Sequence, residues 1–168
     1  SMTDAKDKNG NLLPDEDRMT DFGRKLRATS LDELPELWNI LKGDMSIVGP
    51  RPQLVRDMVF FSEEEMHRQD VTPGLTGLAQ ISGRNNIDWK ERFAYDLQYI
   101  EKISLQEDLC IIWRTIFKVG KQEDIATDGM ETSEDYGDWL LRKNRIIEED
   151  YLIKQQRANQ LLNEYVRG

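Results

Sequence analysis

The stretch SLDELPELWNILKG, residues 30–43, carries the helical pattern from which the rest of the chain can be interpreted. Its apolar residues recur at spacings of three and four, on one face of a helix: Leu34, Leu37, Trp38 and Leu41. Ser30 is suited to cap the first turn, and Glu33 stands three positions later, as in a capping box. Gly43 is expected to end the helix. The stretch therefore predicts an amphipathic helix that packs its apolar face on a neighbour.

Similar spacing predicts further helices on both sides of this stretch, over residues 15–28, 53–70, 88–103, 104–119 and 138–166. Two rigid turns that combine proline and glycine lie between them, at residues 48–52 and 73–77. Residues 78–82 are short enough for a strand or one arm of a hairpin. The expected fold class is α-rich α+β, with several amphipathic helices, a small β-hairpin, a single domain and a long C-terminal helix.

The composition is typical of one globular domain with an acidic surface. The 168 residues are 38% hydrophobic, which is enough for a packed core. The 23 Lys and Arg against 32 Asp and Glu give a net charge of −9, which argues against a nucleic acid as a partner. No run approaches about 18 apolar residues and no cationic-then-apolar leader is present, so we expect neither a spanning helix nor a signal peptide.

The single cysteine and the single histidine limit the chemistry that the chain can perform. Cys110 excludes an intramolecular disulfide and a cysteine-based zinc cluster. It lies in the apolar run 109–113, so we expect a buried structural thiol. His67 follows three glutamates and is expected on a solvated helix face. With no Ser-His or Cys-His pair to expect, carboxylates and arginines must carry any catalysis.

Two adjacent carboxylates, Asp32 and Glu33, are the first candidates for catalysis. They stand in the first turn of the predicted helix, where free backbone N–H groups and the helix dipole favour negative charge. A purely structural interpretation is also open, because acids are common at helix N-termini and Glu33 can bond back to Ser30.

Arginines beside rigid turns are the second candidates. Arg27 lies one turn before the acidic pair, Arg51 stands between Pro50 and Pro52, and Arg84 follows Gly83. An arginine on stiff backbone suits bidentate recognition of a phosphate, because its planar fork loses little freedom on binding. Each of them alone could equally be a surface ion-pair partner. The set favours an anionic phosphate substrate.

A calcium loop is a competing interpretation of the N-terminal region. Residues 5–16 match the loop pattern in part, with Asp7, Asn9, Gly10 and Glu16 in suitable positions. Ala5 stands where the pattern requires an aspartate, and Pro14 stiffens the second half. The sequence therefore disfavours calcium binding here.

Three blocks of this sequence stand out: the first is residues 26–52, the second comprises 73–80 and 82–85, and the third comprises 96–99 and 104–109. Together they resemble the signature of the bacterial sugar transferases. These are the monotopic phosphoglycosyl transferases, which initiate the assembly of surface glycans and glycoproteins. The similarity covers roughly residues 3–120. Leu78 stands where an aromatic residue is usual and Ser82 where asparagine is usual, and neither is a catalytic position.

The resemblance implies a reaction and assigns roles to residues. Members of the family transfer a sugar-1-phosphate from a nucleotide diphosphosugar, usually a UDP-sugar, to polyprenol phosphate, with Mg²⁺ and release of UMP. The catalytic Asp-Glu pair of the family, which also serves the metal, falls on Asp32 and Glu33. The Pro-Arg-Pro element falls on residues 50–52, and the phosphate-contacting arginine falls on Arg84, after the turn at Gly83. A carboxylate can attack phosphorus without a histidine when metal and arginines neutralise the phosphate charge.

The resemblance also implies a membrane location and a domain division. The family begins with a hydrophobic re-entrant segment and a short basic stretch, neither of which is found in these 168 residues. We expect that segment to hold the full protein at the cytoplasmic face of the bacterial inner membrane, and this chain to be its soluble part. The expected divisions are a catalytic core at 3–120, an acidic linker at 121–137 and a C-terminal helical extension at 138–168.

The C-terminal extension carries an imperfect heptad seam: Ile147, Tyr151, Lys154, Ala158, Leu161 and Tyr165. It predicts either self-association into a homo-oligomer or a helix docked on its own domain. An alternative for the whole chain is a non-catalytic helical interaction module, in which the acidic pair only caps a helix. Hydrolysis of a labelled UDP-sugar, or its retention on the protein, distinguishes that module from the enzyme.

Overall fold

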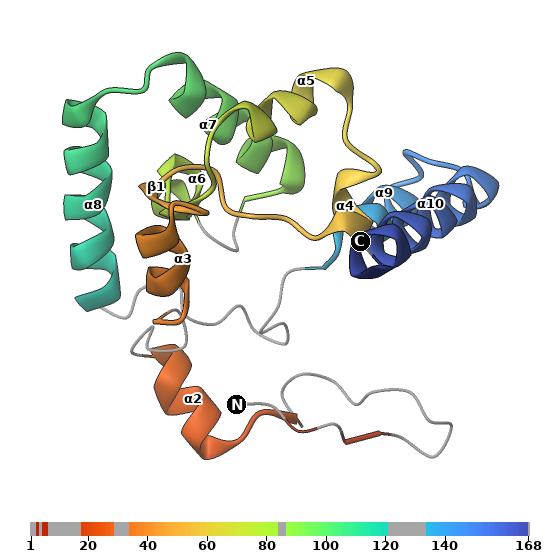
Figure 1. The fold of residues 1–168 in the computed structure, drawn as a ribbon, viewed down its shortest axis with the longest axis horizontal. Coiled ribbons are helices and arrows are strands. Elements are labelled where there is room, and N and C mark those ends of the chain that lie inside the picture. The colour runs from red at the N-terminus through yellow and green to blue at the C-terminus, as the bar shows by residue number, and fades with distance from the viewer. Residues whose placement is uncertain are drawn as a thin grey trace. The chain divides into compact units, whose positions relative to one another are not determined.

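A computed structural model describes residues 3, 5, 6, 18–28, 34–83, 87–120 and 134–167 (Figure 1). It is mostly helical with a small two-stranded sheet, which confirms the α-rich α+β class. The chain forms two compact units. The first unit comprises residues 1–51 and 71–133, and the second comprises 52–70 and 134–168. The domain boundaries expected from the sequence stay a prediction.

The first unit contains the strands and most of the helices. Its elements are α2 (Asp21–Ala28), α3 (Glu36–Lys42), β1 (Ser46–Val48), β2 (Gly74–Thr76), α6 (Leu78–Ser82), α7 (Trp89–Glu101) and α8 (Leu105–Gly120). Its buried centre is a small cluster to which β1, α6, α7 and α8 each contribute one residue: Val48, Ile81, Tyr99 and Ile111.

The two strands pair in parallel, which corrects the expected hairpin. Ser46 lies opposite Gly74, and Val48 lies opposite Thr76. Parallel strands need a long crossover, which residues 49–73 supply. Residues 78–82, expected as a strand or hairpin arm, form α6 instead. Leucine, alanine and glutamine there favour helix, and the turn buries Ala79 and Ile81.

Capping residues set the ends of the longer helices. Asp88 and Glu91 form a capping box at the start of α7. The Ser104 hydroxyl accepts a hydrogen bond from the Glu107 amide at 3.2 Å, which confirms the predicted start of α8. Gly43 ends α3 in the left-handed conformation, with φ of 85°, as expected. The predicted cap at Ser30 lies outside the described residues, and α3 begins at Glu36, later than the sequence predicted. The apolar residues of the stretch 30–43, which were expected to pack on a neighbour, are exposed: Leu34, Leu37, Trp38 and Leu41.

The second unit consists of short helices from the middle of the chain and two helices from its C-terminal region. These are α4 (Val55–Met58), α5 (Glu63–Met66), the 3₁₀ turn η2 (His67–Asp70), α9 (Tyr136–Arg142) and α10 (Glu148–Arg167). The single helices expected over 53–70 and 138–166 are therefore each divided. Between α9 and α10 the chain turns at Asn144, whose φ is 52°.

Tyr136 is at the centre of the second unit and is 1% exposed. Its amide donates a hydrogen bond to Oδ1 of Asp57 at 2.8 Å, and its hydroxyl donates to Oε1 of Glu65 at 3.1 Å. Its ring contacts Phe61 and Trp139, each at a centroid distance of 5.9 Å. Residues 52–70, which lie within the predicted core 3–120, thus pack on Tyr136, which lies in the predicted linker 121–137.

The middle of α10 docks on its own unit, as one of the two alternatives for the seam predicted. Tyr151 stacks on Phe60 with ring centroids 5.6 Å apart. The Lys154 ammonium donates to the Val59 carbonyl at 2.8 Å, and Ala158 is 1% exposed. At the two ends of the seam, Ile147 and Tyr165 are exposed.

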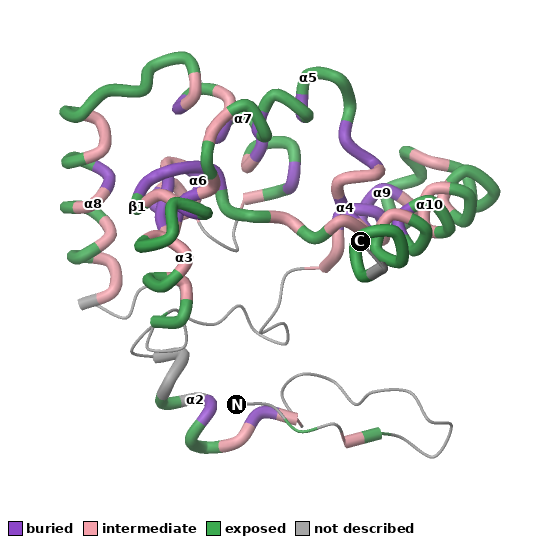
Figure 2. Tube along the Cα trace, in the orientation of Figure 1, coloured by how far each residue is buried: buried purple, intermediate pink, exposed green. Residues whose placement is uncertain are grey.

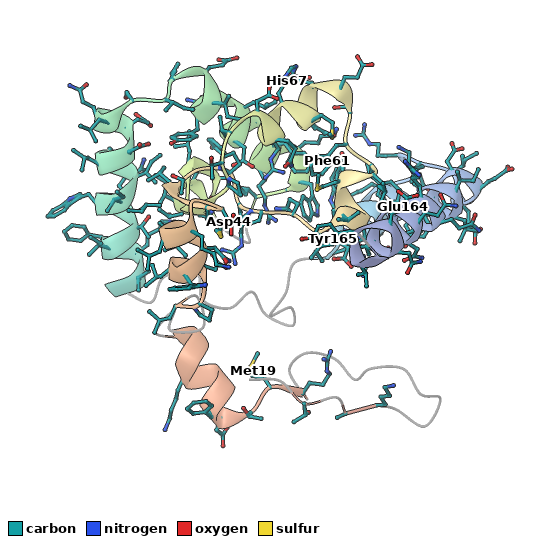
Figure 3. The ribbon with its side chains drawn as sticks, in the orientation of Figure 1. Met19, Asp44, Phe61, His67, Glu164 and Tyr165 are labelled. Atoms are coloured by element: carbon teal, nitrogen blue, oxygen red, sulfur yellow. The ribbon has the colours of Figure 1, made fainter. Side chains whose placement is uncertain are left out.

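Two single-residue expectations have different outcomes. His67 lies on the surface, as expected, with 66% of its side chain exposed (Figure 3). Cys110 is exposed, so the expectation of a buried thiol is wrong. Ile111 of α8 points into the core and has no exposed surface, so the neighbouring Cys110 points outward.

Among the described helices, none is long and apolar enough to cross a bilayer.

Candidate functional site

The parallel strand pair brings the two proline- and glycine-containing turns together. The Gly49 amide donates to the Thr76 carbonyl at 2.9 Å, and the Gly74 amide donates to the Pro50 carbonyl at 2.9 Å. Residues 48–52 and 73–77 are thus joined by backbone hydrogen bonds. The turn that carries Arg51 is a fixed part of the first unit and not a loose loop.

Glycine is required at this junction because the two backbones touch. A Cβ atom on Gly74 would overlap the amide nitrogen and Cα of Gly49, and a Cβ on Gly77 would overlap the Gly49 carbonyl oxygen. Neither neighbour is a flexible side chain that could move aside. The glycines of the two quoted blocks therefore serve close backbone approach.

The Pro-Arg-Pro element leaves this junction with its arginine directed to the surface. Pro50 is buried, whereas Arg51 and Pro52 are exposed. Arg51 is the last residue of the first unit before the chain enters the second. Flanking prolines restrict the backbone around it, so the Cα atom from which its side chain extends is held in place.

A buried tyrosine holds β1 from the side. The Tyr99 hydroxyl lies 2.7 Å from Oδ1 of Asp108 and 3.4 Å from the Val48 carbonyl. Burial and then the Asp108 hydrogen bond raise the pKa of this phenol, so it stays protonated and donates. The Asp108 acceptor lies on α8, and the hydroxyl thereby joins α7, α8 and the end of β1.

A pair of threonines holds β2 to the same helix. The hydroxyl of Thr115 donates to the Ile111 carbonyl at 2.8 Å and lies 2.7 Å from the Thr76 hydroxyl. Because the Thr115 proton is used in the bond to Ile111, the Thr76 hydroxyl is the donor between the two threonines, and both hydroxyls are hydrogen-bonded. Sequence reasoning did not identify Tyr99 or the two threonines, because their partners are 9 and 39 residues away along the chain.

Gln80 is a further residue that sequence reasoning missed. Both polar atoms of its carboxamide are buried, and neither has a hydrogen-bond partner among the described residues. Its Oε1 lies beside Gly77, next to the junction of the two turns. A carboxamide offers both donors and acceptors, so it could bind a hydroxyl or a carbonyl of a ligand.

Several predicted site residues lie outside the described residues: Asp32, Glu33 and Arg84, together with most of the calcium-loop pattern at 5–16. Arg27 is in α2, and its side chain is not described. Gly83 ends α6 and packs against the Ile87 side chain. The structure therefore places Pro50, Arg51, Pro52 and Gly83 and leaves the acidic pair as a prediction.

The candidate metal ligands are the two carboxylates predicted from the sequence, Asp32 and Glu33. Within the described part of the chain, no group of three or more His, Cys, Asp or Glu residues is placed to hold a metal ion. Asp32 and Glu33 would supply carboxylate oxygens, which are the ligands that Mg²⁺ prefers. The donor set thus suits the ion that the family resemblance implies.

Comparison with known proteins agrees with the blocks quoted from the sequence. The family model described as "Bacterial sugar transferase" matches residues 1–122, well over half of the chain. A Bacillus subtilis protein named "Uncharacterized sugar transferase EpsL" is 47% identical over 134 residues, which cover 80% of this chain and 66% of that protein.

Two further relatives carry names that state a reaction. "UDP-glucose:undecaprenyl-phosphate glucose-1-phosphate transferase" of Caulobacter vibrioides is 46% identical over 109 residues, or 60% of this chain and 41% of that protein. "Undecaprenyl-phosphate galactose phosphotransferase" of Salmonella typhimurium is 43% identical over 103 residues, or 61% and 22%. The chain thus spans 22% to 66% of the length of these relatives. The match over residues 1–122 shows that the chain belongs to the bacterial sugar transferase family.

Proposed function

We propose that this chain is the catalytic part of a phosphoglycosyl transferase that initiates the assembly of a surface glycan or glycoprotein. It moves a sugar-1-phosphate from a nucleotide diphosphosugar, most simply a UDP-sugar, to polyprenol phosphate at the cytoplasmic face of the bacterial inner membrane. The supporting observation is the family match over residues 1–122, together with relatives named for transfer to undecaprenyl phosphate.

The proposed reaction has two displacements at one phosphorus atom. A carboxylate oxygen of Asp32 attacks the phosphorus that bears the sugar, and the bond from that phosphorus to the bridging oxygen breaks and releases UMP. A phosphate oxygen of the polyprenol phosphate then attacks the same phosphorus. The acyl-phosphate bond breaks, the Asp32 carboxylate is regenerated, and polyprenol diphosphosugar leaves.

The neighbouring residues have distinct roles in this proposal. Glu33 orients Asp32 or shares the metal, while Asp32 alone attacks the phosphorus atom. Arg51 and Arg84 bind phosphate oxygens, with Arg27 as a further candidate. A Mg²⁺ ion held by Asp32 and Glu33 would neutralise charge on the donor phosphates.

The position of Arg51 supports its role in binding phosphate. The residue is exposed, while the backbone on which it stands is hydrogen-bonded to the 73–77 turn. A cation on a fixed base loses little conformational entropy when it binds an anion, so positioning accounts for much of its contribution.

The first displacement can be tested directly on this chain by intact-protein mass spectrometry. The chain is incubated with Mg²⁺ and each member of a panel of UDP-sugars, without lipid. One donor should add the mass of its sugar phosphate and release an equal amount of UMP. Asp32→Asn keeps size and capping ability but removes the nucleophile, so it should add no mass while its melting temperature stays close to that of the wild type.

Two outcomes would overturn the proposal. Retention of the adduct in Asp32→Asn would show that another residue is the nucleophile. The absence of both adduct and UMP release with every donor, with Mg²⁺ present, would favour the non-catalytic interaction module. Glu33→Gln separates capping from chemistry, because its amide can still bond back to Ser30.

A further inference from the structure

The carboxamide of Gln80 is a buried polar group with no partner in the described part of the chain. Gln80 is the third residue of α6, and both Oε1 and Nε2 of its side chain are buried. Neither atom has a hydrogen-bond partner among the residues that the structure describes. A buried polar group without a partner is unfavourable, because it loses its contact with water and gains no bond in return. Buried carboxamides in proteins are therefore almost always hydrogen-bonded, which points to a partner that binds from outside the chain.

This carboxamide lies beside the backbone that carries Arg51. A Cβ atom built on Gly77 would lie 2.8 Å from Oε1 of Gln80 and would overlap the carbonyl oxygen of Gly49. Both oxygens therefore border the same side of Gly77. The Gly49 carbonyl belongs to the peptide bond that enters the Pro-Arg-Pro element. Figure 2 shows buried residues, in purple, around β1 and α6, so the carboxamide lies in a tightly packed part of the first unit.

The helix α6 also leads along the chain to the second arginine proposed to bind phosphate. It begins directly after Gly77 in the 73–77 turn and ends at Gly83, which Arg84 follows in the sequence. Five helical residues span only about 7.5 Å. A diphosphate bound by both Arg51 and Arg84 would therefore lie close to α6, and the groups on either side of the diphosphate would be within reach of Gln80.

We propose that Gln80 binds the nucleotide diphosphosugar, through an edge that presents a hydrogen-bond donor and an acceptor side by side. This proposal rests on the function proposed above. The carboxamide accepts at Oε1 and donates at Nε2. Phosphate oxygens only accept, so they would leave Oε1 unpaired beside a negative charge. The imide edge of uracil and the neighbouring hydroxyls of a sugar present both kinds of group, so Gln80 binds the uridine or the transferred sugar and not the diphosphate.

The side chain can reach a ligand without a change in the fold. Gln80 as a whole is only partly buried, so part of its side chain already lies near the surface. Ala79 and Ile81 hold α6 in the core. Rotation about the side-chain bonds of Gln80 can therefore turn the carboxamide outward while α6 stays in place. In the free chain this rotation breaks no hydrogen bond to a described residue.

Gln80→Met tests whether the carboxamide has a structural partner. Methionine has a similar length and flexibility but lacks the carboxamide, so the variant removes a buried polar group and keeps the packing. Its melting temperature should equal or exceed that of the wild type. Gln160→Met, at an exposed glutamine of α10, is the matched control and should change neither the melting temperature nor binding. A fall of more than about 5 °C in Gln80→Met alone would show that the carboxamide already has a partner in the free protein.

Two measurements distinguish the uridine from the transferred sugar as the group that Gln80 binds. The first is calorimetric titration with UMP and Mg²⁺, and the second is the UDP-sugar concentration at which adduct formation is half-maximal. If Gln80 binds the uridine, Gln80→Met should weaken both by about 10-fold or more. If it binds the sugar, UMP affinity should stay unchanged while the half-maximal UDP-sugar concentration rises by that factor. The maximal rate should change less than this concentration, because Gln80 does not touch the reacting phosphorus.

Two results would overturn the proposal. One is the loss of stability in Gln80→Met, and the other is an unchanged UMP affinity together with an unchanged half-maximal UDP-sugar concentration. Adduct formation by the wild type tests the proposed chemistry and needs no Gln80 variant. If the wild type forms the adduct and Gln80→Met behaves as Gln160→Met does, the chemistry stands and only the role of Gln80 is wrong. If the wild type forms no adduct with any UDP-sugar, the proposed function itself fails.

Discussion

The hydroxyl of Tyr136 donates a hydrogen bond to Oε1 of Glu65 at 3.1 Å in the buried interior of the second unit. The other oxygen of the same carboxylate accepts from the Ser62 amide at 2.8 Å, as part of the capping box of α5. A residue beyond the family match thus completes the hydrogen bonds of a helix within it. The segment that the sequence predicted to be a linker therefore contributes a buried hydrogen bond to residues 52–70.

Tyr136→Phe should destabilise the second unit by about 1–3 kcal/mol, because Glu65 loses a buried partner while the ring keeps its packing. Urea unfolding followed by hydrogen exchange in residues 52–70 measures the change. Tyr165→Phe is the matched control, since Tyr165 is 87% exposed, and it should have an effect within about 0.5 kcal/mol. Equal effects of the two substitutions would contradict the structural role of this hydrogen bond.

The structure also predicts the oligomeric state. Tyr151, Lys154 and Ala158, the middle of the heptad seam, already contact their own unit, so only the ends of the seam remain for a second copy. We expect the chain to sediment as a monomer. A wild-type dimer that becomes a monomer in the double variant Ile147→Gln with Tyr165→Gln would contradict this expectation and would show self-association through α10. Removing α10 is a poorer test, because it would expose the apolar side chains on which α10 packs.

The sequence predicted those helices whose ends and faces are set by local residues. α7 and α8 begin at Asp88 and Ser104, whose side chains cap their own helices. The helix expected over 15–28 is interrupted at residues 19 and 20, before α2 begins at Asp21, and the helix expected over 53–70 is interrupted at residues 59–62. Each of those segments is short, so contacts with packing neighbours determine where its helices begin and end. The spacing of its own apolar residues does not.

Contacts between distant residues could not be predicted in the same way. Each strand has three residues, and the pairing of Ser46 with Gly74 depends on a crossover that no local pattern encodes. Cys110 was misplaced because the run 109–113 is apolar on every side, so the spacing does not decide which residue faces the core. In the candidate site, the rigid turns were predictable, but their contact through three glycines was not.

The pH dependence of stability should report on Asp57. Burial is the main cause that raises the pKa of this carboxyl above its ordinary 3.8, and Asp135 adds to it, while the Tyr136 amide and Arg56 oppose it. The folded state therefore holds the proton more tightly than the unfolded state. The contribution to stability is greatest below 3.8 and declines as pH rises from 3.8 to the raised value.

Asp57→Asn removes this titration and keeps an oxygen that can accept from the Tyr136 amide. Relative to the Asn variant, the wild type should lose free energy of unfolding as pH rises through that window, and the difference should then be constant. Urea unfolding of both proteins from about pH 3 to about pH 7 gives the two curves. Parallel curves would show that Asp57 has the same pKa in the folded and unfolded states.

The junction of the two turns predicts different effects for two glycine substitutions. Gly74→Ala would drive a methyl group into the backbone of Gly49 and should unfold the first unit or lower its stability by several kcal/mol. Gly43→Ala meets no atom within 4 Å and should cost only about 1 kcal/mol, for its positive φ. Thermal unfolding followed by far-UV circular dichroism compares them. Similar melting temperatures would show that the turns can separate.

Arg51 should matter more for chemistry than for stability, because the residue is exposed and its backbone is held by the 73–77 turn. Arg51→Gln removes the charge and should lower the rate of UMP release from the UDP-sugar by about 10²-fold. Arg51→Lys keeps the charge but not the planar fork, so an intermediate loss of about 10-fold is expected. Arg157→Lys, at an exposed position on α10, is the control and should leave the rate unchanged. Melting temperatures of all three variants should stay close to that of the wild type.

If Arg51→Gln released UMP as fast as the control, Arg51 would have no part in binding the donor phosphates. If Arg51→Lys equalled the wild type while Arg51→Gln did not, charge alone would suffice and bidentate binding would be wrong.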